Sequence, residues 1–189
     1  MDDRELTVAL ATNLDSAFET LVRCHVDRVY AIALRLLGSA EDAEEVAQDT
    51  FVRAFRALGG YDGERVRALE LRPWLAAITT NAARNRRRRT LDRRPPVSLT
   101  AGMTGRTSDG LPERDTIRHA DTERLARLVA ELPERYRIAI VLRYVDDLSY
   151  PQMAQALGRP EGTLKAQVHR GLALLRAAHD ADEREELTA

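Results

Sequence analysis

The sequence predicts an all-α protein in which two small helical domains are joined by a flexible linker. Apolar residues recur at helical spacing in two blocks, residues 14–92 and 117–179, and neither block alternates as a strand would. Alanine, leucine, arginine and glutamate, which favour helix, dominate both blocks. The intervening DRRPPVSLTAGMTGRTSDGLPERD has prolines, glycines and no apolar period. We therefore expect a linker over residues 93–116 and a frayed tail over residues 180–189.

Three helices are predicted in the first block. Residues 16–37 have helical apolar spacing, with Asp15 as a candidate N-cap and a glycine at the end. Residues 39–58 open with a capping-box pattern, in which Ser39 precedes an acid three residues later, and stop at two glycines. After the turn-rich YDGERVRALEL, residues 73–89 form the third helix, because proline suits a first helical turn.

A helix-turn-helix pattern lies in the second block, in LSYPQMAQALGRPEGTLKAQVHRGLALLR, residues 148–176. Ser149 and Gln152 can form a capping box, and Gly158 permits a tight turn before the second helix. Leucines and a valine form the buried stripe of that helix. The side chains off the stripe can reach phosphates and base edges in a major groove: Thr163, Lys165, Ala166, Gln167, His169 and Arg170. An ordinary helical hairpin with a solvated polar face remains the alternative.

Positive charge is concentrated in one part of a chain whose formal net charge is −1. Residues 1–60 carry 11 acidic and 6 basic side chains, whereas residues 61–99 carry 4 and 10. Most of those arginines lie in NAARNRRRRTLDRRPP, residues 81–96. An acidic block beside a basic block predicts two different partners on neighbouring surfaces.

On the helix 73–89, Asn81, Asn85 and Arg88 recur at i, i+4 and i+7 and so share one outward face. Thr80, Arg84 and Arg87 lie beside them. Such a surface can follow a phosphate backbone and offer amides to bases. The alternative is a solvated helix end whose cations favour the C-terminal dipole, which suits Arg86 and Arg89 best.

Several classes of protein are not expected. The acidic N-terminus lacks the features of a signal peptide, and no apolar run is long enough to span a membrane, so we expect a cytoplasmic protein without membrane insertion. Cys24 is the only cysteine, which excludes an internal disulfide. The four histidines have no metal-ligand spacing with acids, and no phosphate-binding glycine loop occurs. We expect no enzyme, catalytic residue, metal, cofactor or small-molecule substrate.

The two blocks resemble a known family. DLSYPQMAQALGRPEGTLKAQVHRGLALLR resembles region 4 of the extracytoplasmic-function (ECF) class of bacterial RNA polymerase sigma factors, in the sigma-70 family. DAEEVAQDTFVRAFRAL and RPWLAAITTNAARNRRRR resemble region 2 of the same family. The resemblances cover most of residues 16–92 and 120–178, in the family's order. They imply a region 2 bundle over residues 14–92 and a region 4 helix-turn-helix over residues 117–179.

The resemblance implies a transcription initiation factor with core RNA polymerase and promoter DNA as partners, and an anti-sigma protein as a further partner. Region 4 would read the −35 element with the six side chains given above that lie outside the buried stripe of the second helix. Region 2 would bind the polymerase clamp and open the −10 element. The positions that match the clamp contacts are Asp42, Glu45, Gln48 and Asp49. Those implied for the −10 element are Tyr61, Arg65, Arg67, Thr80, Asn81, Arg84, Asn85, Arg87 and Arg88.

Departures from the family pattern bear on promoter choice. Ala166 and Gln167 stand where serine and arginine are common, and Asn85 stands where aspartate is common. The promoter sequence is therefore not inherited from a relative. A stand-alone helix-turn-helix regulator, which binds DNA without polymerase, is the alternative function. Without the resemblance, a solvated acidic face is the favoured interpretation of these acids on the helix 39–58, because that is the usual role of such a run.

Overall fold

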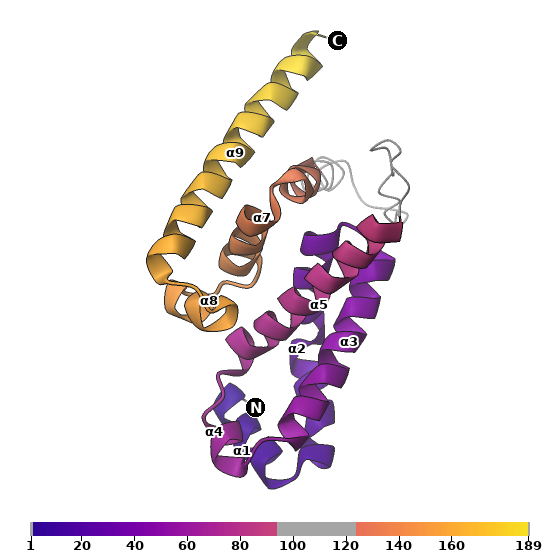
Figure 1. The fold of residues 1–189 in the computed structure, drawn as a ribbon, viewed down its shortest axis with the longest axis vertical. Coiled ribbons are helices and arrows are strands. Elements are labelled where there is room, and N and C mark those ends of the chain that lie inside the picture. The colour runs from indigo at the N-terminus through magenta and orange to yellow at the C-terminus, as the bar shows by residue number, and fades with distance from the viewer. Residues whose placement is uncertain (1, 94–123, 189) are drawn as a thin grey trace, which may run out of the picture.

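The computed structural model describes residues 2–93 and 124–188, and these residues form helices and turns without a strand (Figure 1). The all-α prediction is confirmed. The expected linker lies outside the described residues, except for Arg93 at its start. We call residues 2–93 the first domain and residues 124–188 the second domain.

The first domain contains five helices: α1 Asp3–Thr12, α2 Leu14–Leu37, α3 Ala40–Gly59, α4 Gly63–Arg67 and α5 Leu71–Arg93. The three predicted helices are α2, α3 and α5. The N-cap of α2 is Asn13, whose side chain accepts a hydrogen bond from the Ser16 amide, and not Asp15 as predicted. Ser39 caps α3 by accepting from the Asp42 amide at 3.3 Å. Gly38 ends α2 with a φ of 74°, which is a left-handed conformation that glycine adopts without strain.

Two helices of the first domain were not expected. α1 begins with a capping box, in which Asp2 accepts from the Glu5 amide and Glu5 accepts from the Asp2 amide. α4 is a single short helix capped by Asp62. Both lie at the lower end of the bundle in Figure 1. Their buried side chains join α2, α3 and α5 in one apolar cluster whose fully buried members include Leu6, Leu21, Leu71 and Leu75.

The second domain begins with a helix that covers the described residues 124–131 and stops before Pro133. Next come α7 Glu134–Ile140, a π-helical turn η1 Val141–Val145, α8 Tyr150–Leu157 and α9 Glu161–Thr188. α8 and α9 are the predicted helix-turn-helix. α9 continues to Thr188 and so includes most of residues 180–189, for which the sequence predicts a frayed tail.

The helix-turn-helix follows the sequence pattern closely. The capping box between Ser149 and Gln152 is present, and Gly158 has a φ of 62° at the turn. Leu164 and Val168 are buried on the inner stripe of α9. On the same helix Gly171 lies against Ile140 of α7, where even a Cβ atom would come within 2.9 Å of Ile140 Cγ1. Because glycine has no side chain, α9 can pack closely against α7 at this point.

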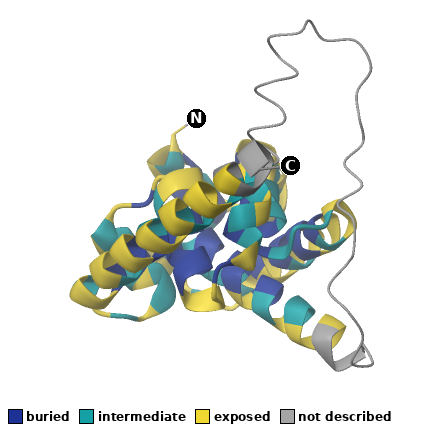
Figure 2. Ribbon diagram, turned by 90° about the horizontal axis from the view of Figure 1, so that it is seen from above, coloured by how far each residue is buried: buried dark blue, intermediate teal, exposed yellow. Residues whose placement is uncertain are grey.

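The two domains pack against each other in the structure. One cluster of buried apolar residues contains Ile32 and Leu36 of α2 and Ala83 of α5, together with Ile138 and Met153 of the second domain. In Figure 2 the buried residues lie in the interior between the helices, and the exposed residues lie on their outer faces. The arrangement therefore has a shared apolar seam, which the sequence pattern alone does not predict.

Candidate nucleic-acid and polymerase interfaces

The outward face of α5 is only partly open. Asn81, Asn85 and Arg88 are exposed together, as their spacing predicts. Thr80, expected beside them, is buried with 1 % of its surface exposed. It is covered because the second domain packs on that side of α5. Arg84 is half-buried there, and its Nε atom donates to Glu134 Oε1 of α7 at 2.8 Å.

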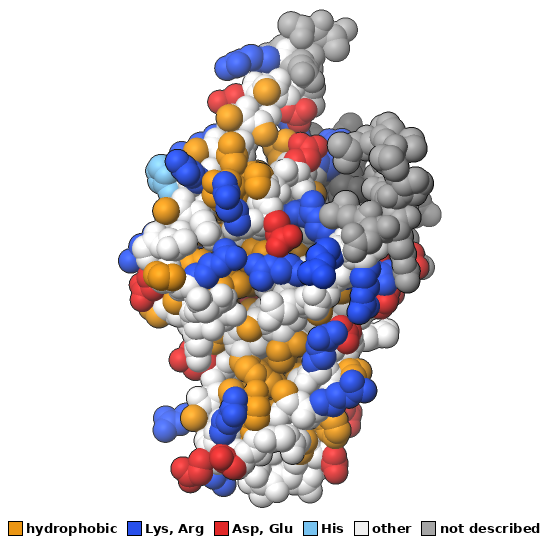
Figure 3. Space-filling view, viewed as in Figure 1, with side chains coloured by type: hydrophobic (Ala, Val, Ile, Leu, Met, Phe, Trp, Pro, Cys, Tyr) orange, Lys and Arg blue, Asp and Glu red, His pale blue; other side chains and the backbone are white. Residues whose placement is uncertain are grey.

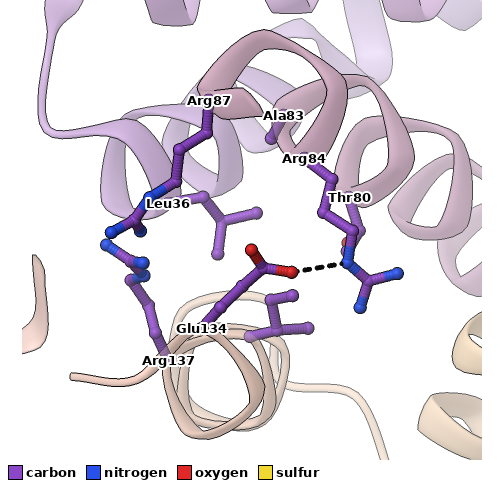
Figure 4. Close-up of a pocket in the computed structure, with 8 residues that line it drawn as sticks. Leu36, Thr80, Ala83, Arg84, Arg87, Glu134 and Arg137 are labelled. Atoms are coloured by element: carbon purple, nitrogen blue, oxygen red, sulfur yellow. Dashed lines mark hydrogen bonds and ion pairs between the residues drawn. The ribbon is translucent and has the colours of Figure 1, made fainter. Parts of the chain in front are cut away.

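Two basic side chains of α5, Arg84 and Arg87, line a small pocket at this seam. It is lined by Leu36, Thr80, Ala83, Arg84, Arg87, Glu134, Arg137 and Ile138. In the close-up of Figure 4, Glu134 lies between Arg84 on one side and Arg87 and Arg137 on the other. Lys and Arg side chains also cross the middle of the molecular face in Figure 3. The pocket thus holds the carboxylate of Glu134 among three guanidinium groups.

A second basic cluster lies at α4. The guanidinium carbon of Arg65 is 3.8 Å from the centre of the Tyr61 ring, a cation–π contact. Tyr61 is also next to Trp74 of α5, with 6.4 Å between ring centres. Arg65 and Arg67 are exposed, and Arg67 lies 4.0 Å from Glu64. The cluster offers an aromatic face and cations beside the start of α5, which suits a nucleobase and its phosphate.

The acidic patch of α3 is partly neutralised by α5. Arg86 Nε donates to Asp42 Oδ1 at 2.7 Å, and Arg86 Nη1 lies 2.5 Å from Glu45 Oε2. The hydrogen bond to Asp42 and the nearby acids raise the pKa of Arg86. The expectation that Arg86 is a solvated helix-end cation was therefore wrong. Of the other two patch residues, Asp49 accepts from Arg53 at 2.8 Å, and Gln48 is exposed.

The outward face of α9 is open. Thr163, Lys165, Ala166, His169 and Arg170 are all exposed. Gln167 is half-buried, and its Oε1 accepts from Arg159 Nη1 at 3.4 Å. Lys165 lies 3.7 Å from Glu161 in an exposed ion pair of the kind that contributes little to stability. These side chains are available to a ligand in this arrangement of the domains.

The structure adds residues of α7 to this face. A shallow groove beside the start of α9 is lined by Arg135, Tyr136, Gly162, Thr163, Ala166, Gln167 and Arg170. Arg135 is exposed and donates to the Tyr136 hydroxyl at 2.9 Å. That hydrogen bond, together with Arg170, lowers the pKa of Tyr136. Arg135 escaped prediction because it belongs to another helix, and no spacing within α9 points to it.

The deepest polar contact in the seam is centred on Asp146, after η1. Its carboxylate pairs with Arg28 Nε of α2, and its carbonyl oxygen accepts from Arg72 Nη2 of α5 at 2.7 Å. The carboxylate has no exposed surface. Burial raises the pKa of Asp146 to about 6, although Arg28 and Arg72 oppose this shift. Two arginines of the first domain therefore hold one residue of the second.

Within the described ranges, no group of His, Cys, Asp and Glu side chains has the arrangement of a metal site. No helix among those residues has the length and apolar character needed to span a membrane. The polar clusters found are pairs of cations with acids, amides and aromatic rings. They are suited to recognise charged macromolecules by hydrogen bonds and ion pairs.

Comparison with known proteins agrees with this chemistry. Residues 21–93 match the family described as Sigma-70 region 2, and residues 122–175 match Sigma-70, region 4. Over 170 residues the chain is 32% identical to the ECF RNA polymerase sigma factor SigW of Bacillus subtilis (strain 168), covering 85% of this chain and 87% of that protein. It is 35% identical over 167 residues to the ECF RNA polymerase sigma factor SigE of Mycolicibacterium smegmatis, covering 85% of this chain and 60% of that protein.

Solved structures share the fold. CnrH, in a complex with the cytosolic domain of CnrY, aligns over 95% of this chain and 98% of its own, with a TM-score of 0.70 and 27% identity. The sigma factor RpoE of Bartonella quintana, in a complex with the anti-sigma factor NepR, aligns with a TM-score of 0.62 and 22% identity, over 87% of this chain and 98% of its own. The chain therefore belongs to the ECF class of RNA polymerase sigma factors, which bind core RNA polymerase and give it promoter specificity.

Proposed function

We propose that the two domains divide promoter recognition between them. The first domain opens the −10 element, and the second reads the −35 element as duplex. The observation that carries this proposal is that one molecule exposes two different polar and basic helix faces. α5 exposes Asn81, Asn85 and Arg88 on one face, and α9 exposes a mixed face of small, polar and basic side chains.

The chemistry of each face suits a different form of DNA. The amides of Asn81 and Asn85 can hydrogen-bond to the edges of unpaired bases, and Arg88 can follow the phosphate backbone. The Tyr61–Arg65 pair, with Arg67 nearby, offers a stacking surface for an extruded base. On α9, Lys165, His169 and Arg170 can position a duplex, while Thr163, Ala166 and Gln167 can contact base edges.

Core polymerase would bind the acidic patch of α3. The exposed Glu45 and Gln48, with the half-buried Asp42 and Asp49, form a surface that suits a basic, arginine-bearing helix. Asp42 and Glu45 also hold Arg86 and so fix α5 against α3. The patch would couple polymerase binding to the helix that contacts the −10 element. We place this activity in the cytoplasm, where bacterial polymerase works, and assign the chain no catalytic role.

An anti-sigma protein is the further partner that we propose. The family resemblance supports it, and CnrH and RpoE were both solved as complexes with another protein. A protein that kept the two domains together would prevent them from reaching separate promoter elements.

The function is tested by transcription in vitro. Purified protein and core polymerase are mixed with fragmented DNA of the source genome, and transcript 5′ ends are sequenced. We expect starts that need this protein and share upstream −35 and −10 sequences. Failure to add starts, while a reference sigma factor does so with the same core, would overturn the proposal.

Variants distinguish the two proposed steps, which are binding of the −35 element and opening of the −10 element. The double variant Asn81→Ala and Asn85→Ala should leave polymerase bound at the promoter but lower the permanganate reactivity of unpaired thymines. Arg170→Ala should weaken promoter binding before opening. Arg176→Ala, which removes another exposed cation of α9 beyond the recognition residues, serves as the control. Equal effects of Arg170→Ala and Arg176→Ala would count against the assigned −35 face.

A further inference from the structure

We propose that the pocket between α5 and α7 binds one phosphate group, carried either by inorganic phosphate or by a small phosphomonoester such as a nucleotide. The groups that would hold it are the Arg87 guanidinium, Arg137 Nη2 and the Thr80 hydroxyl, all of which belong to the lining of this pocket. Binding of a phosphate there would not depend on the proposed role of α5 in promoter opening.

The lining of the pocket carries an excess of positive charge. Guanidinium groups of Arg84, Arg87 and Arg137 stand against the carboxylate of Glu134, which leaves a formal charge of +2. Glu134 accepts a hydrogen bond from Arg84 Nε at 2.8 Å, so its charge is directed to that side of the pocket (Figure 4). Neither Arg87 nor Arg137 forms an ion pair with any residue that the structure describes. A phosphate, with a charge of about −1.5 to −2 at neutral pH, would balance the excess.

Arg137 is a buried cation that is only partly satisfied. It is 3 % exposed, and its Nη1 atom donates to the Ala130 carbonyl oxygen at 2.6 Å. Its Nη2 atom is buried and has no hydrogen-bond partner among the described residues. In Figure 4 the guanidinium ends of Arg137 and Arg87 point toward each other. An anion that contacted both would satisfy Nη2 and remove the repulsion between the two cations.

Thr80 supplies a hydroxyl group that its own helix does not use. A helical threonine commonly donates to the carbonyl oxygen four residues before it, as the neighbouring Thr79 does to Leu75 at 2.8 Å. Thr80 is 1 % exposed, and its Oγ1 atom has no hydrogen-bond partner in the described part of the chain. A buried hydroxyl without a partner is unfavourable. Its place in the lining of the pocket makes it a donor for a bound oxyanion.

The number of donors and the size of the pocket favour phosphate over other anions. A carboxylate is planar and carries one charge, whereas phosphate is tetrahedral and offers at least three acceptor oxygens to donors from two helices. The pocket has about 220 Å³ of space and is open to solvent. Pockets for drug-sized ligands have about 300–1,000 Å³, so this one suits a single phosphate group. Arg87 is half-buried, so its side chain can move to admit the anion.

Binding is tested by calorimetric titration of inorganic phosphate into the full-length chain, with the ionic strength held constant by chloride. We expect saturable binding of one phosphate per chain. A nucleoside 5′-monophosphate should bind as well, and the nucleoside without its phosphate should not. Equal affinity for inorganic phosphate and the monophosphate would identify the free anion as a sufficient ligand. Tighter binding of the monophosphate would identify the phosphomonoester as the preferred one, and both results support the site.

Variants assign the binding to the named donors. Arg87→Gln removes a charged donor and should lower the affinity for phosphate by roughly 10-fold. Thr80→Val keeps the volume of the side chain, removes the hydroxyl, and should lower the affinity by about 2- to 10-fold. Arg89→Gln removes an exposed cation of the same helix outside the pocket and should leave the affinity unchanged.

Glu134→Gln should change the affinity in the opposite direction. The variant removes the negative charge of the pocket but keeps a side-chain oxygen that can accept from Arg84. Because repulsion between the carboxylate and the anion is lost, the affinity for phosphate should rise by about 2- to 5-fold. Glu131→Gln, which makes the same change at an exposed position outside the pocket, is the control. Circular dichroism of each variant verifies that its helices are retained.

Any of three results would overturn the phosphate site: no saturable binding at constant ionic strength, equal losses in Arg87→Gln and Arg89→Gln, or a lower affinity in Glu134→Gln. Transcription with core polymerase separates this site from the proposed function. Promoter-specific starts by a chain that does not bind phosphate would refute the site alone. Phosphate binding by a chain that adds no transcription starts would refute the proposed function and leave the site intact.

Discussion

The carboxylate of Glu134 on α7 accepts a hydrogen bond from Arg84 on α5 at 2.8 Å, and the two residues belong to different domains. Both side chains keep partial contact with water, with 47% and 33% of their surfaces exposed. The pair is therefore accessible to substitution without damage to either core. It also joins a proposed DNA contact to the domain that covers it.

Removing the two partners should change DNA binding in opposite directions. Glu134→Ala frees Arg84 and should raise the affinity of the free chain for a labelled single-stranded oligonucleotide by about 2- to 5-fold, because exposed ion pairs contribute about 0.2–1 kcal/mol. Arg84→Ala should lower it by a similar factor. Fluorescence anisotropy at several salt concentrations measures both. Glu131→Ala removes the same charge elsewhere, and an equal gain in that variant would contradict the competition between Glu134 and DNA.

Residues of the acidic patch of α3 should differ in their roles, because some also stabilise the fold and others only contact polymerase. Asp42 holds Arg86, so Asp42→Ala should lower the free energy of unfolding by up to about 1 kcal/mol as well as weaken polymerase binding. Gln48 is exposed, so Gln48→Ala should weaken polymerase binding and leave the melting temperature unchanged. Competition with a reference sigma factor for core polymerase measures binding. Glu44→Ala, an exposed acid on another side of α3, is the control; a loss as large as that of Gln48→Ala would argue against the patch.

The helix ends could be predicted from the sequence because they depend on residues close together in the chain. The cap at Ser39, the capping box at Ser149 and the glycines at positions 38 and 158 set helix ends by short-range hydrogen bonds and backbone conformation, and each lies where it was expected. α1 escaped prediction, although Asp2 and Glu5 form a capping box, because only Leu6 and Leu10 give it an apolar face of its own.

The contact between the domains could not be predicted in the same way. The stripe of α5 that faces the second domain combines alanines with Thr80 and Arg87, so it does not have the composition of a buried face. From the sequence alone, Asp146 has the features of an ordinary acidic loop residue beside Asp147. Its burial depends on arginines that are distant in sequence, and periodicity carries no information about such pairs. The outward Asn81–Asn85–Arg88 face was predictable because it depends on one helix alone.

Three glycines of the second domain should respond differently to alanine. Gly158 has a φ of 62°, so Gly158→Ala should destabilise the protein by about 1 kcal/mol even though its Cβ would meet no atom within 4 Å. Gly162 is helical and equally open, so Gly162→Ala should stabilise by about 0.4–1 kcal/mol. Gly171→Ala should destabilise by about 1–3 kcal/mol, because its Cβ would lie 2.9 Å from Ile140 Cγ1. Chemical denaturation measures all three. The same sign at Gly158 and Gly162 would contradict the assigned backbone conformations.

Arg135 should contribute to duplex binding, although it lies outside the helix-turn-helix. It shares the groove beside α9 with Thr163 and Arg170, so a phosphate there would be within its reach. Arg135→Ala should weaken binding of the promoter duplex identified by transcript mapping. It should also reduce, by about 1, the slope of the logarithm of the binding constant against the logarithm of the salt concentration. Arg127→Ala, which removes an exposed cation outside the groove, should leave both values unchanged. An unaltered salt slope in Arg135→Ala would remove this residue from the DNA contacts.

Acid should strengthen the contact between the two domains through Asp146. Burial at this contact raises the pKa of the Asp146 carboxyl from 3.8 to about 6, against the opposing effect of Arg28 and Arg72 and with a small contribution from Asp147. If the domains separated, the carboxyl would be hydrated and its pKa would return toward 3.8. Between these two pKa values the packed arrangement binds the additional proton. Packing of the domains is therefore favoured as the pH falls through about 6, and this gain is lost as the pH rises above it.

Spin labels on Cys24 of α2 and on Ala173→Cys of α9, both exposed, allow the distance between the domains to be measured by pulsed electron resonance. The population with the domains in contact should increase as the pH is lowered from about 7.5 to about 5, and Asp146→Asn, which cannot titrate, should abolish the change. His25 of α2 lies beside the same arginines, and burial lowers its pKa. Its protonation would add a third cation near Arg28 and Arg72, and it remains in the Asp146→Asn variant. A pH response that persists in Asp146→Asn would therefore assign the effect to His25 or another group and remove Asp146 from the mechanism.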